Sequence, residues 1–122
     1  MDTQQMTFNE YQKLAKLTAI YPDEYNVVYP TLGLTGEAGE VAEKVKKYIR
    51  DGRELDKTGN GYYVDDEVFI KDIKKELGDV LWYLSAIASD LDLSLEDIAQ
   101  TNVEKLKSRL KRDKIKGSGD NR

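Results

Sequence analysis

Residues 70–91 read IKDIKKELGDVLWYLSAIASDL, and this stretch decides the fold. Its apolar side chains recur at intervals of three and four residues, which places them on one face of an α-helix. The positions are Ile70, Ile73, Leu77, Val80, Leu81, Leu84, Ile87, Ala88 and Leu91. The pair Asp65-Asp66 precedes the stretch, and Asp is favoured at helix N-termini. We therefore predict one long helix that starts after residue 66.

Three further segments carry the same periodicity. Thr7 opens a capping-box pattern, and the apolar spacing after it predicts a helix over about residues 8–20. A second pattern predicts a helix that begins at Thr31 and stops at Asp51-Gly52. Ser94 is placed to cap a fourth helix, which continues to about residue 112.

Four amphipathic helices predict an all-α fold, a four-helix bundle-type domain. At 122 residues the chain suffices for one core, so we predict a single helical domain over residues 1–112. Residues 53–66 are polar and contain an Asn-Gly turn signal, which predicts an inserted surface loop with room for a short hairpin. Residues 113–122 end in Gly-Ser-Gly-Asp-Asn-Arg and are predicted to form a disordered tail.

The chain contains no cysteine and no histidine. This composition excludes disulfides, thiolate or imidazole metal ligands and catalysis by a Cys or a Ser–His nucleophile. It also excludes a ferritin-like di-iron site, which needs Glu-x-x-His. A metal must therefore be held by oxygen ligands, which favour magnesium, manganese or calcium over zinc and copper.

Charge and hydropathy limit the partners. The formal net charge is −4, so a general electrostatic grip on a nucleic-acid polymer is not expected. The longest apolar stretch, residues 80–88, is too short to cross a bilayer, and the first residues lack a signal-peptide pattern. We therefore predict a cytoplasmic protein with no membrane and no nucleic-acid partner.

Two pairs of acidic residues have the same spacing. Glu37 and Glu40 lie one turn apart in the predicted second helix, and Glu76 and Asp79 lie one turn apart in the third. At roughly 100° per residue, both pairs lie beside the apolar stripe of their helix. The two pairs are therefore expected to face each other beside the shared core.

The alternative is a solvated acidic face, in which Glu40 pairs with Lys44 and Glu43 with Lys47 at i, i+4. Two features favour a site instead. Asp79 stands among apolar residues, where a carboxylate is costly to bury without a cation. Glycines also interrupt both helices near the acidic pairs, and they allow either close helix approach or room for a ligand. They are Gly33, Gly36, Gly39 and Gly78.

The last predicted helix supplies the opposite charge. Asn102, Lys105 and Arg109 fall on one strip of it, where they could donate hydrogen bonds to phosphate oxygens. A solvated basic face is the alternative. A polyphosphate bound to an acidic metal cage needs such donors on its far side. Trp82 and Tyr83 are candidates for recognition of the base, and the alternative is that they are core or interface residues.

Three segments resemble the MazG-like, all-α nucleotide pyrophosphohydrolases. They are GLTGEAGEVAEKVKK at 33–47, KELGDVLWYL at 75–84 and NVEKLKSR at 102–109. Over about residues 8–112, the resemblance implies a four-helix-type core that forms homodimers or homotetramers. It implies magnesium-dependent cleavage of NTPs or dNTPs to the monophosphate and pyrophosphate, with manganese as a substitute for magnesium.

The resemblance also implies which residues form the site. The implied catalytic and magnesium-binding residues are Glu37, Glu40, Glu76 and Asp79, and the implied phosphate-binding residues are Asn102, Lys105 and Arg109. Either Glu37 or Glu40 is expected to take a proton from the water that attacks the α-phosphorus.

Two features depart from the family pattern. Gly36 stands where many members carry a second acid, which leaves the number of metal ions open. Residues 53–66 lengthen the interval between Glu40 and Glu76, and the role of this insert is also open. The alternative to an enzyme is a non-catalytic helical interaction module, whose stability would not respond to magnesium.

Overall fold

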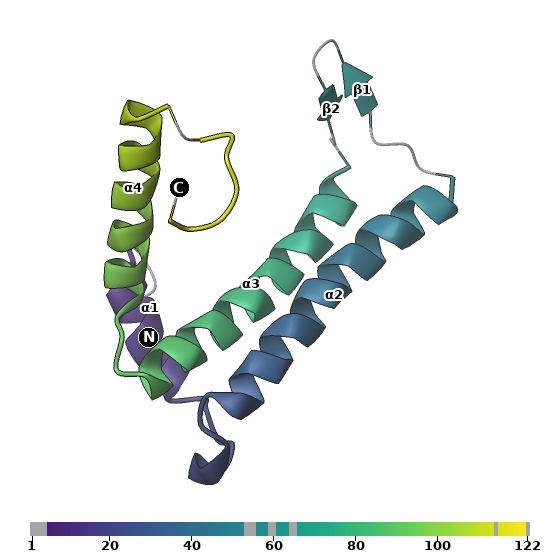
Figure 1. Cartoon of the computed structure of the whole chain (residues 1–122). Helices are drawn as coiled ribbons and strands as arrows, with labels where there is room; N and C mark the ends of the chain where they lie inside the picture. Colours follow the sequence, from purple (N-terminus) through teal and green to yellow (C-terminus); the bar gives the residue numbers. More distant parts are fainter. Residues whose placement is uncertain (1–4, 53–55, 59–60, 64–65, 114, 122) are drawn as a thin grey trace.

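In the computed structural model, the residues described are 5–52, 56–58, 61–63, 66–113 and 115–121. The elements follow in the order α1 (Phe8–Lys16), the 3₁₀ helix η1 (Asp23–Tyr25), α2 (Val28–Arg50), β1 (Asp56–Thr58), β2 (Gly61–Tyr63), α3 (Glu67–Asp90) and α4 (Leu95–Lys111) (Figure 1). The predicted all-α class is confirmed, because α-helices make up most of this described chain.

Three α-helices begin at predicted caps. The side chains of Thr7, Asp66 and Ser94 each accept a hydrogen bond from the backbone N–H three residues later, at 3.0–3.1 Å. These bonds satisfy N–H groups that the first turn of a helix leaves unpaired.

Two helix ends differ from the predicted ones. α2 begins at Val28 rather than at Thr31, because Pro30 lies in its first turn, where a missing N–H costs no hydrogen bond. α1 ends at Lys16 rather than near residue 20. Just beyond it, the Thr18 hydroxyl donates to the Ala15 carbonyl at 2.7 Å and accepts from Trp82 Nε1 at 2.8 Å. The bond to Trp82 is a tertiary contact, so the apolar periodicity of the segment could not predict that the helix ends before it.

α2 and α3 pack side by side as a long antiparallel pair, with the hairpin of β1 and β2 at one end (Figure 1). The strands pair antiparallel, with Asp56 opposite Tyr63 and Thr58 opposite Gly61. They lie within the predicted insert. The predicted acidic pairs, Glu37 with Glu40 and Glu76 with Asp79, lie near the middle of α2 and α3.

α1 joins the other helices through Gln12. Its Nε2 donates to Ser89 Oγ at 3.0 Å and to the Leu93 carbonyl at 2.8 Å, and its Oε1 accepts from the Leu95 N–H at 2.9 Å. α1 thus packs on the end of α3 and on α4, whereas α4 runs away from α2 (Figure 1).

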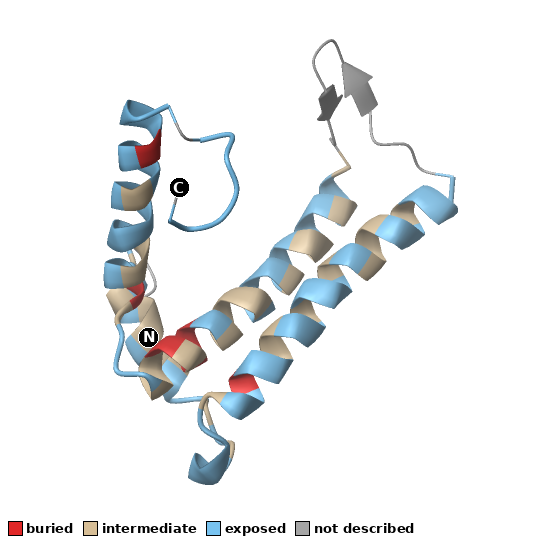
Figure 2. Cartoon of the chain, viewed as in Figure 1, coloured by how far each residue is buried: buried red, intermediate tan, exposed pale blue. Residues whose placement is uncertain are grey.

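The core is small and lies near the junction of α1, α3 and α4 (Figure 2). Its buried residues there include Ser85, Ala86, Ala88 and Leu95. Many apolar side chains stay exposed, among them Leu32, Ile49, Leu77, Leu84, Val103, Leu106 and Leu110. A single chain therefore leaves apolar faces of α2, α3 and α4 uncovered.

Residues 115–121 form turns that return to α4. The division into a domain at 1–112 and a disordered tail at 113–122 stays a prediction. Within the described ranges, no helix combines the length and the apolar character that a membrane crossing requires.

Candidate functional site

Three carboxylates from two helices meet near the middle of the α2–α3 pair. Glu37 of α2 and Glu76 and Asp79 of α3 each offer one oxygen, and these oxygens all lie within 4.8 Å of one another. Glu37 and Glu76 are half-buried and Asp79 is exposed. We call these three residues the acidic cluster. The facing of the two helices that the spacing predicts thus brings together three of the four predicted carboxylates.

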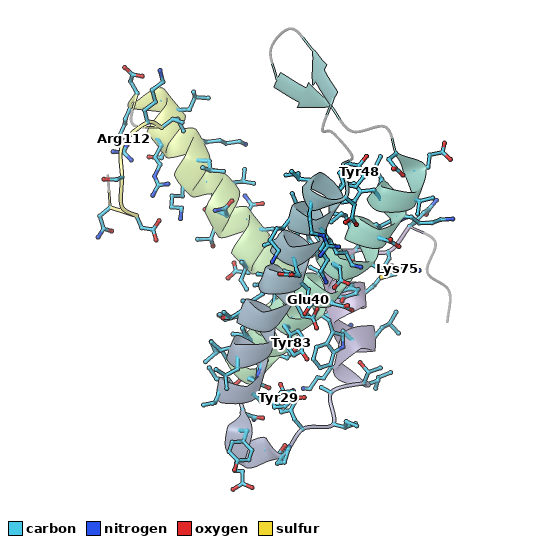
Figure 3. The ribbon with its side chains drawn as sticks, turned by 90° about the vertical axis from the view of Figure 1, so that its right-hand side faces the viewer. Tyr29, Glu40, Tyr48, Lys75, Tyr83 and Arg112 are labelled. Atoms are coloured by element: carbon cyan, nitrogen blue, oxygen red, sulfur yellow. The ribbon has the colours of Figure 1, made fainter. Side chains whose placement is uncertain are left out.

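Glu40 lies one turn further along α2, on an exposed part of the helix. Its oxygens are not part of the acidic cluster. Its negative charge nonetheless acts on Glu37. Glu40 on α2 and Tyr83 on α3 are labelled in Figure 3, beside the acidic cluster.

The crowding of negative charge has an electrostatic consequence. Partial burial, followed by the charges of Asp79, Glu76 and Glu40 and a hydrogen bond with Glu76, raises the pKa of Glu37. Like charges at short distance favour either protonation of one carboxylate or a bound cation. Carboxylate oxygens alone make up this donor set, and such a set suits magnesium or manganese. The residues present therefore fit the metal that the sequence predicts.

Lys44 contacts the acidic cluster, although it is not among the residues predicted from the sequence. Its Nζ lies 3.7 Å from Oε1 of Glu76 on the opposite helix. Among the residues that the structure describes, no ion pair joins Lys44 to Glu40, so that predicted pair is absent. Lys44 stands seven residues after Glu37, which places both on one face of α2. This spacing could have identified it.

The other predicted surface pair is present but weak. Lys47 Nζ lies 3.9 Å from Oε1 of Glu43, and Lys46 lies closer, at 2.9 Å. These side chains are substantially exposed, so their ion pairs contribute little to stability.

Aromatic side chains line the acidic cluster on one side. A pocket of about 360 Å³ is bounded by Thr18, Glu37, Asp79, Trp82 and Tyr83. The Trp82 and Tyr83 rings meet edge to face, with centroids 5.0 Å apart. Partial burial is the main cause that raises the pKa of Tyr83. The phenol is therefore protonated beside the carboxylates.

The glycines near the acidic pairs differ in their surroundings. A Cβ at Gly33 would overlap the ring of Tyr83, so glycine there permits the close approach of α2 to α3. A Cβ at Gly36, Gly39 or Gly78 would meet no atom of the described residues. The predicted packing role therefore applies to Gly33, whereas the other three leave open space.

The predicted basic strip lies on α4, and within one chain it does not reach the acidic cluster. Asn102 is exposed, and the other two residues contact the tail. Lys105 Nζ lies 3.1 Å from Asp120 Oδ1, and Arg109 Nη2 donates to the same oxygen at 3.3 Å. Arg109 also donates to the carbonyls of Gly119 and Asp120, at 3.2 and 3.0 Å. Both cations thus bind a carboxylate in this structure.

Comparison with known proteins places the chain in a family. A family model described as "MazG nucleotide pyrophosphohydrolase domain" matches residues 30–112. The "Gene 37 protein" of Mycobacterium phage L5 is 45% identical over 118 residues, which cover 92% of this chain and 96% of the phage protein. No solved structure matches the chain.

Proposed function

Because the chain belongs to the family of MazG nucleotide pyrophosphohydrolases, we propose that it hydrolyses NTPs or dNTPs to the nucleoside monophosphate and pyrophosphate. The observation that carries the proposal is the acidic cluster, whose three carboxylate oxygens lie within 4.8 Å of one another. The members of this cluster repel one another, so a bound cation would stabilise it. A cytoplasmic location stays a prediction.

The acidic cluster is the proposed ligand set for magnesium, with manganese as a substitute. When bound, the metal would neutralise negative charge on the triphosphate and lower the pKa of a water molecule. Glu37, Glu76 and Asp79 would hold it, and Lys44, 3.7 Å from Glu76, would limit the negative charge at the edge of the site.

We assign Glu40 to proton transfer in this proposal. It is exposed, and it lies near enough to influence Glu37 while its oxygens stay outside the cluster. It would take the proton of the water that attacks the α-phosphorus, while the bond from that phosphorus to the bridging oxygen breaks and pyrophosphate leaves. The alternative role for Glu40 is that of a fourth metal ligand.

The basic strip supports a shared site in an oligomer. Lys105 and Arg109 already donate hydrogen bonds to a carboxylate, so both can bind an anionic group. They belong, however, to a helix that runs away from α2. We therefore propose a homodimer or homotetramer in which Asn102, Lys105 and Arg109 of one chain contact the triphosphate held by another. The exposed apolar faces of α2, α3 and α4 would supply the interface.

The direct test is product analysis. The purified protein is incubated with NTPs and dNTPs in magnesium, and the products are separated by ion-exchange chromatography. We expect monophosphate and pyrophosphate from the wild type and none from Asp79→Asn. Glu67→Gln changes an exposed carboxylate at the start of α3 and should keep full activity. Intact substrate with magnesium and with manganese would favour the interaction module instead.

Glu40→Gln separates the two roles of that residue. Loss of a base should lower kcat by about 10²–10⁴-fold while the magnesium concentration for half-maximal binding stays unchanged. Loss of a ligand should weaken magnesium binding instead. Binding is followed by the metal-dependent rise in melting temperature, which needs no turnover.

A further inference from the structure

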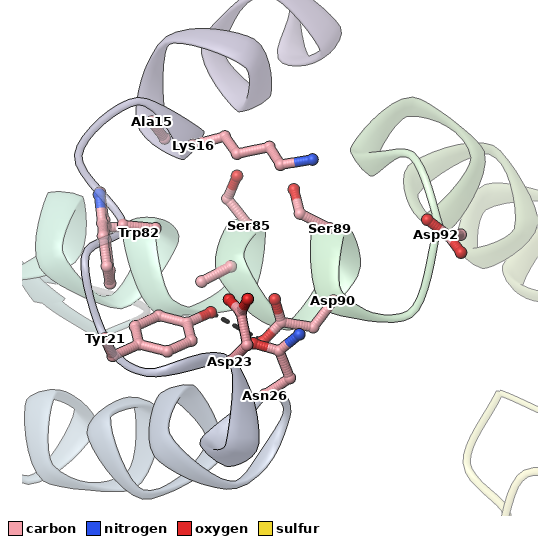
Figure 4. A pocket seen from close by; sticks show the side chains of 12 residues that line it. Ala15, Lys16, Tyr21, Asp23, Asn26, Trp82, Ser85, Ser89, Asp90 and Asp92 are labelled. Carbon is pink, nitrogen blue, oxygen red and sulfur yellow. Dashed lines mark hydrogen bonds between the residues drawn. The ribbon is translucent and has the colours of Figure 1, made fainter.

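A second, larger pocket shares Trp82 with the pocket beside the acidic cluster. Its volume is about 500 Å³, within the range of small-molecule sites, and it lies between α1, η1 and the C-terminal half of α3 (Figure 4). Trp82 lines this pocket and also the smaller one that contains Glu37 and Asp79. The two pockets therefore lie next to each other, with Trp82 between them.

The two sides of the larger pocket differ in chemistry. Trp82 stands at one end, and its Nε1 is held by Thr18. The polar residues on the α1 side are Lys16, Ser85 and Ser89, and those on the η1 side are Tyr21, Asp23, Asn26 and Asp90, while Asp92 lies at the end opposite Trp82 (Figure 4). The lining is therefore mainly polar, with the indole of Trp82 at one end, and suits a polar ring with hydrogen-bonding groups better than an apolar ligand.

The η1 side is shaped by a strained turn. Val27 has φ 68° and ψ −48°, and the Val28 N–H donates to the Asn26 carbonyl at 2.7 Å, which together define a γ-turn of the rare, strained kind. Positive φ is an outlier for a β-branched residue. Asp90 Oδ2 holds the turn by accepting from the Val27 N–H at 2.8 Å and from the Tyr21 hydroxyl at 2.7 Å. Strain of this kind collects at ligand sites.

Asp90 has acceptor capacity left over. Both of its hydrogen bonds are made by Oδ2, and Oδ1 has no partner among the residues that the structure describes. Burial, followed by the hydrogen bond to Asp90, raises the pKa of Tyr21, so the phenol remains a donor and Asp90 an acceptor. Asp23 adds a second carboxylate on the same side.

A carboxylate accepts hydrogen bonds and donates none. It therefore matches an exocyclic amino group, such as N4 of cytosine, N6 of adenine or N2 of guanine, and repels the carbonyl oxygen O4 that uracil and thymine carry in place of the amino group of cytosine.

We propose that this pocket binds the nucleoside of the triphosphate, with the base against Trp82 and an exocyclic amino group facing Asp23 and Asp90. The triphosphate then extends past Trp82 to Glu37 and Asp79. This inference rests on the proposed function, and it names the substrate class as nucleotides whose base carries an amino group. Base stacking on the aromatic ring supplies affinity, and the two carboxylates supply selectivity.

The test uses Trp82, which is the one tryptophan of the chain. Tryptophan fluorescence of the whole chain is titrated with dCMP and with dTMP in the absence of metal. We expect quenching by dCMP with a Kd about tenfold or more below that of dTMP. Unchanged fluorescence with both nucleotides, or equal affinities, would overturn the proposal.

A variant tests the role of Asp90 in selectivity. In Asp90→Asn, the amide oxygen keeps an acceptor for Tyr21 and Val27 while the amide NH₂ faces the base. The preference for dCMP over dTMP should then disappear or reverse, whereas loss of the turn alone would weaken both nucleotides equally. Asp97→Asn, on the exposed first turn of α4, should keep the wild-type preference. If circular dichroism shows that Asp90→Asn does not fold, Asp23→Asn tests the same preference.

The two proposals fail in different ways. Quenching by dCMP without hydrolysis of any triphosphate would overturn the proposed function and leave the pocket in place. Hydrolysis that treats all bases alike, with no response of Trp82, would overturn the pocket and leave the proposed function in place.

Discussion

The carboxylate of Glu37 is repelled by three others, those of Asp79, Glu76 and Glu40. Without a metal this repulsion opposes folding, because it raises the pKa of Glu37 and so disfavours its charged form. We expect Glu37→Gln to raise the melting temperature in EDTA. The same change removes a ligand, so magnesium should no longer raise the melting temperature as it does in the wild type. Thermal unfolding in EDTA and in magnesium measures both effects, and an unchanged magnesium response would contradict the metal site.

Asp120 is the residue whose contact should depend on pH. Lys105 and then Arg109 lower its pKa below the ordinary 3.8. A lowered folded-state pKa means that the contact contributes stability above the unfolded pKa and loses it as pH falls through the folded pKa. The tail contact should therefore persist at pH 4 and be released only at more acidic pH. An NMR titration of the Asp120 carboxyl carbon measures the midpoint, and a midpoint at or above the ordinary value would contradict the contact.

At the scale of elements, the separation of α2 from α3 is set where Gly33 meets the ring of Tyr83. Gly33→Ala adds a methyl group where the ring already lies, so we expect destabilisation of about 1–3 kcal/mol. Gly36→Ala is the matched control: its Cβ meets no described atom, so better helix propensity should stabilise the monomer by about 0.5–1 kcal/mol. Urea unfolding measures both variants. Equal behaviour of the two would show that the Gly33 contact does not limit the approach of the helices.

Some features of the helices could be predicted from the sequence and others could not. The caps at Thr7, Asp66 and Ser94 are local interactions, and the sequence predicted all three. The meeting of Glu37 with Glu76 and Asp79 could also be predicted, because helical periodicity fixes which face of each helix they occupy. The strained turn at Val27 was not accessible, because it depends on Asp90, which lies 63 residues away in the chain.

At the scale of the whole molecule, the direction of α4 could not be predicted from the sequence. Periodicity places Asn102, Lys105 and Arg109 on one strip, but the angle between helices depends on tertiary contacts such as those of Gln12. A four-helix bundle-type fold suggests that strip and acidic cluster share one core. In the structure α4 packs on α1 instead, so a shared site requires either a second chain or a movement of α4.

Mixing two inactive variants distinguishes these possibilities. Asp79→Asn lacks part of the cluster and Arg109→Ala lacks part of the strip. In a symmetric dimer whose sites each combine the cluster of one chain with the strip of the other, random pairing makes half of the dimers mixed, and each mixed dimer has one intact site. Co-refolding equal amounts should therefore restore about a quarter of wild-type activity. If α4 swings onto its own cluster, every site keeps a defect and mixing restores nothing. Light scattering during size-exclusion chromatography gives the oligomeric state of the same samples, and a monomer with full activity would exclude the shared site.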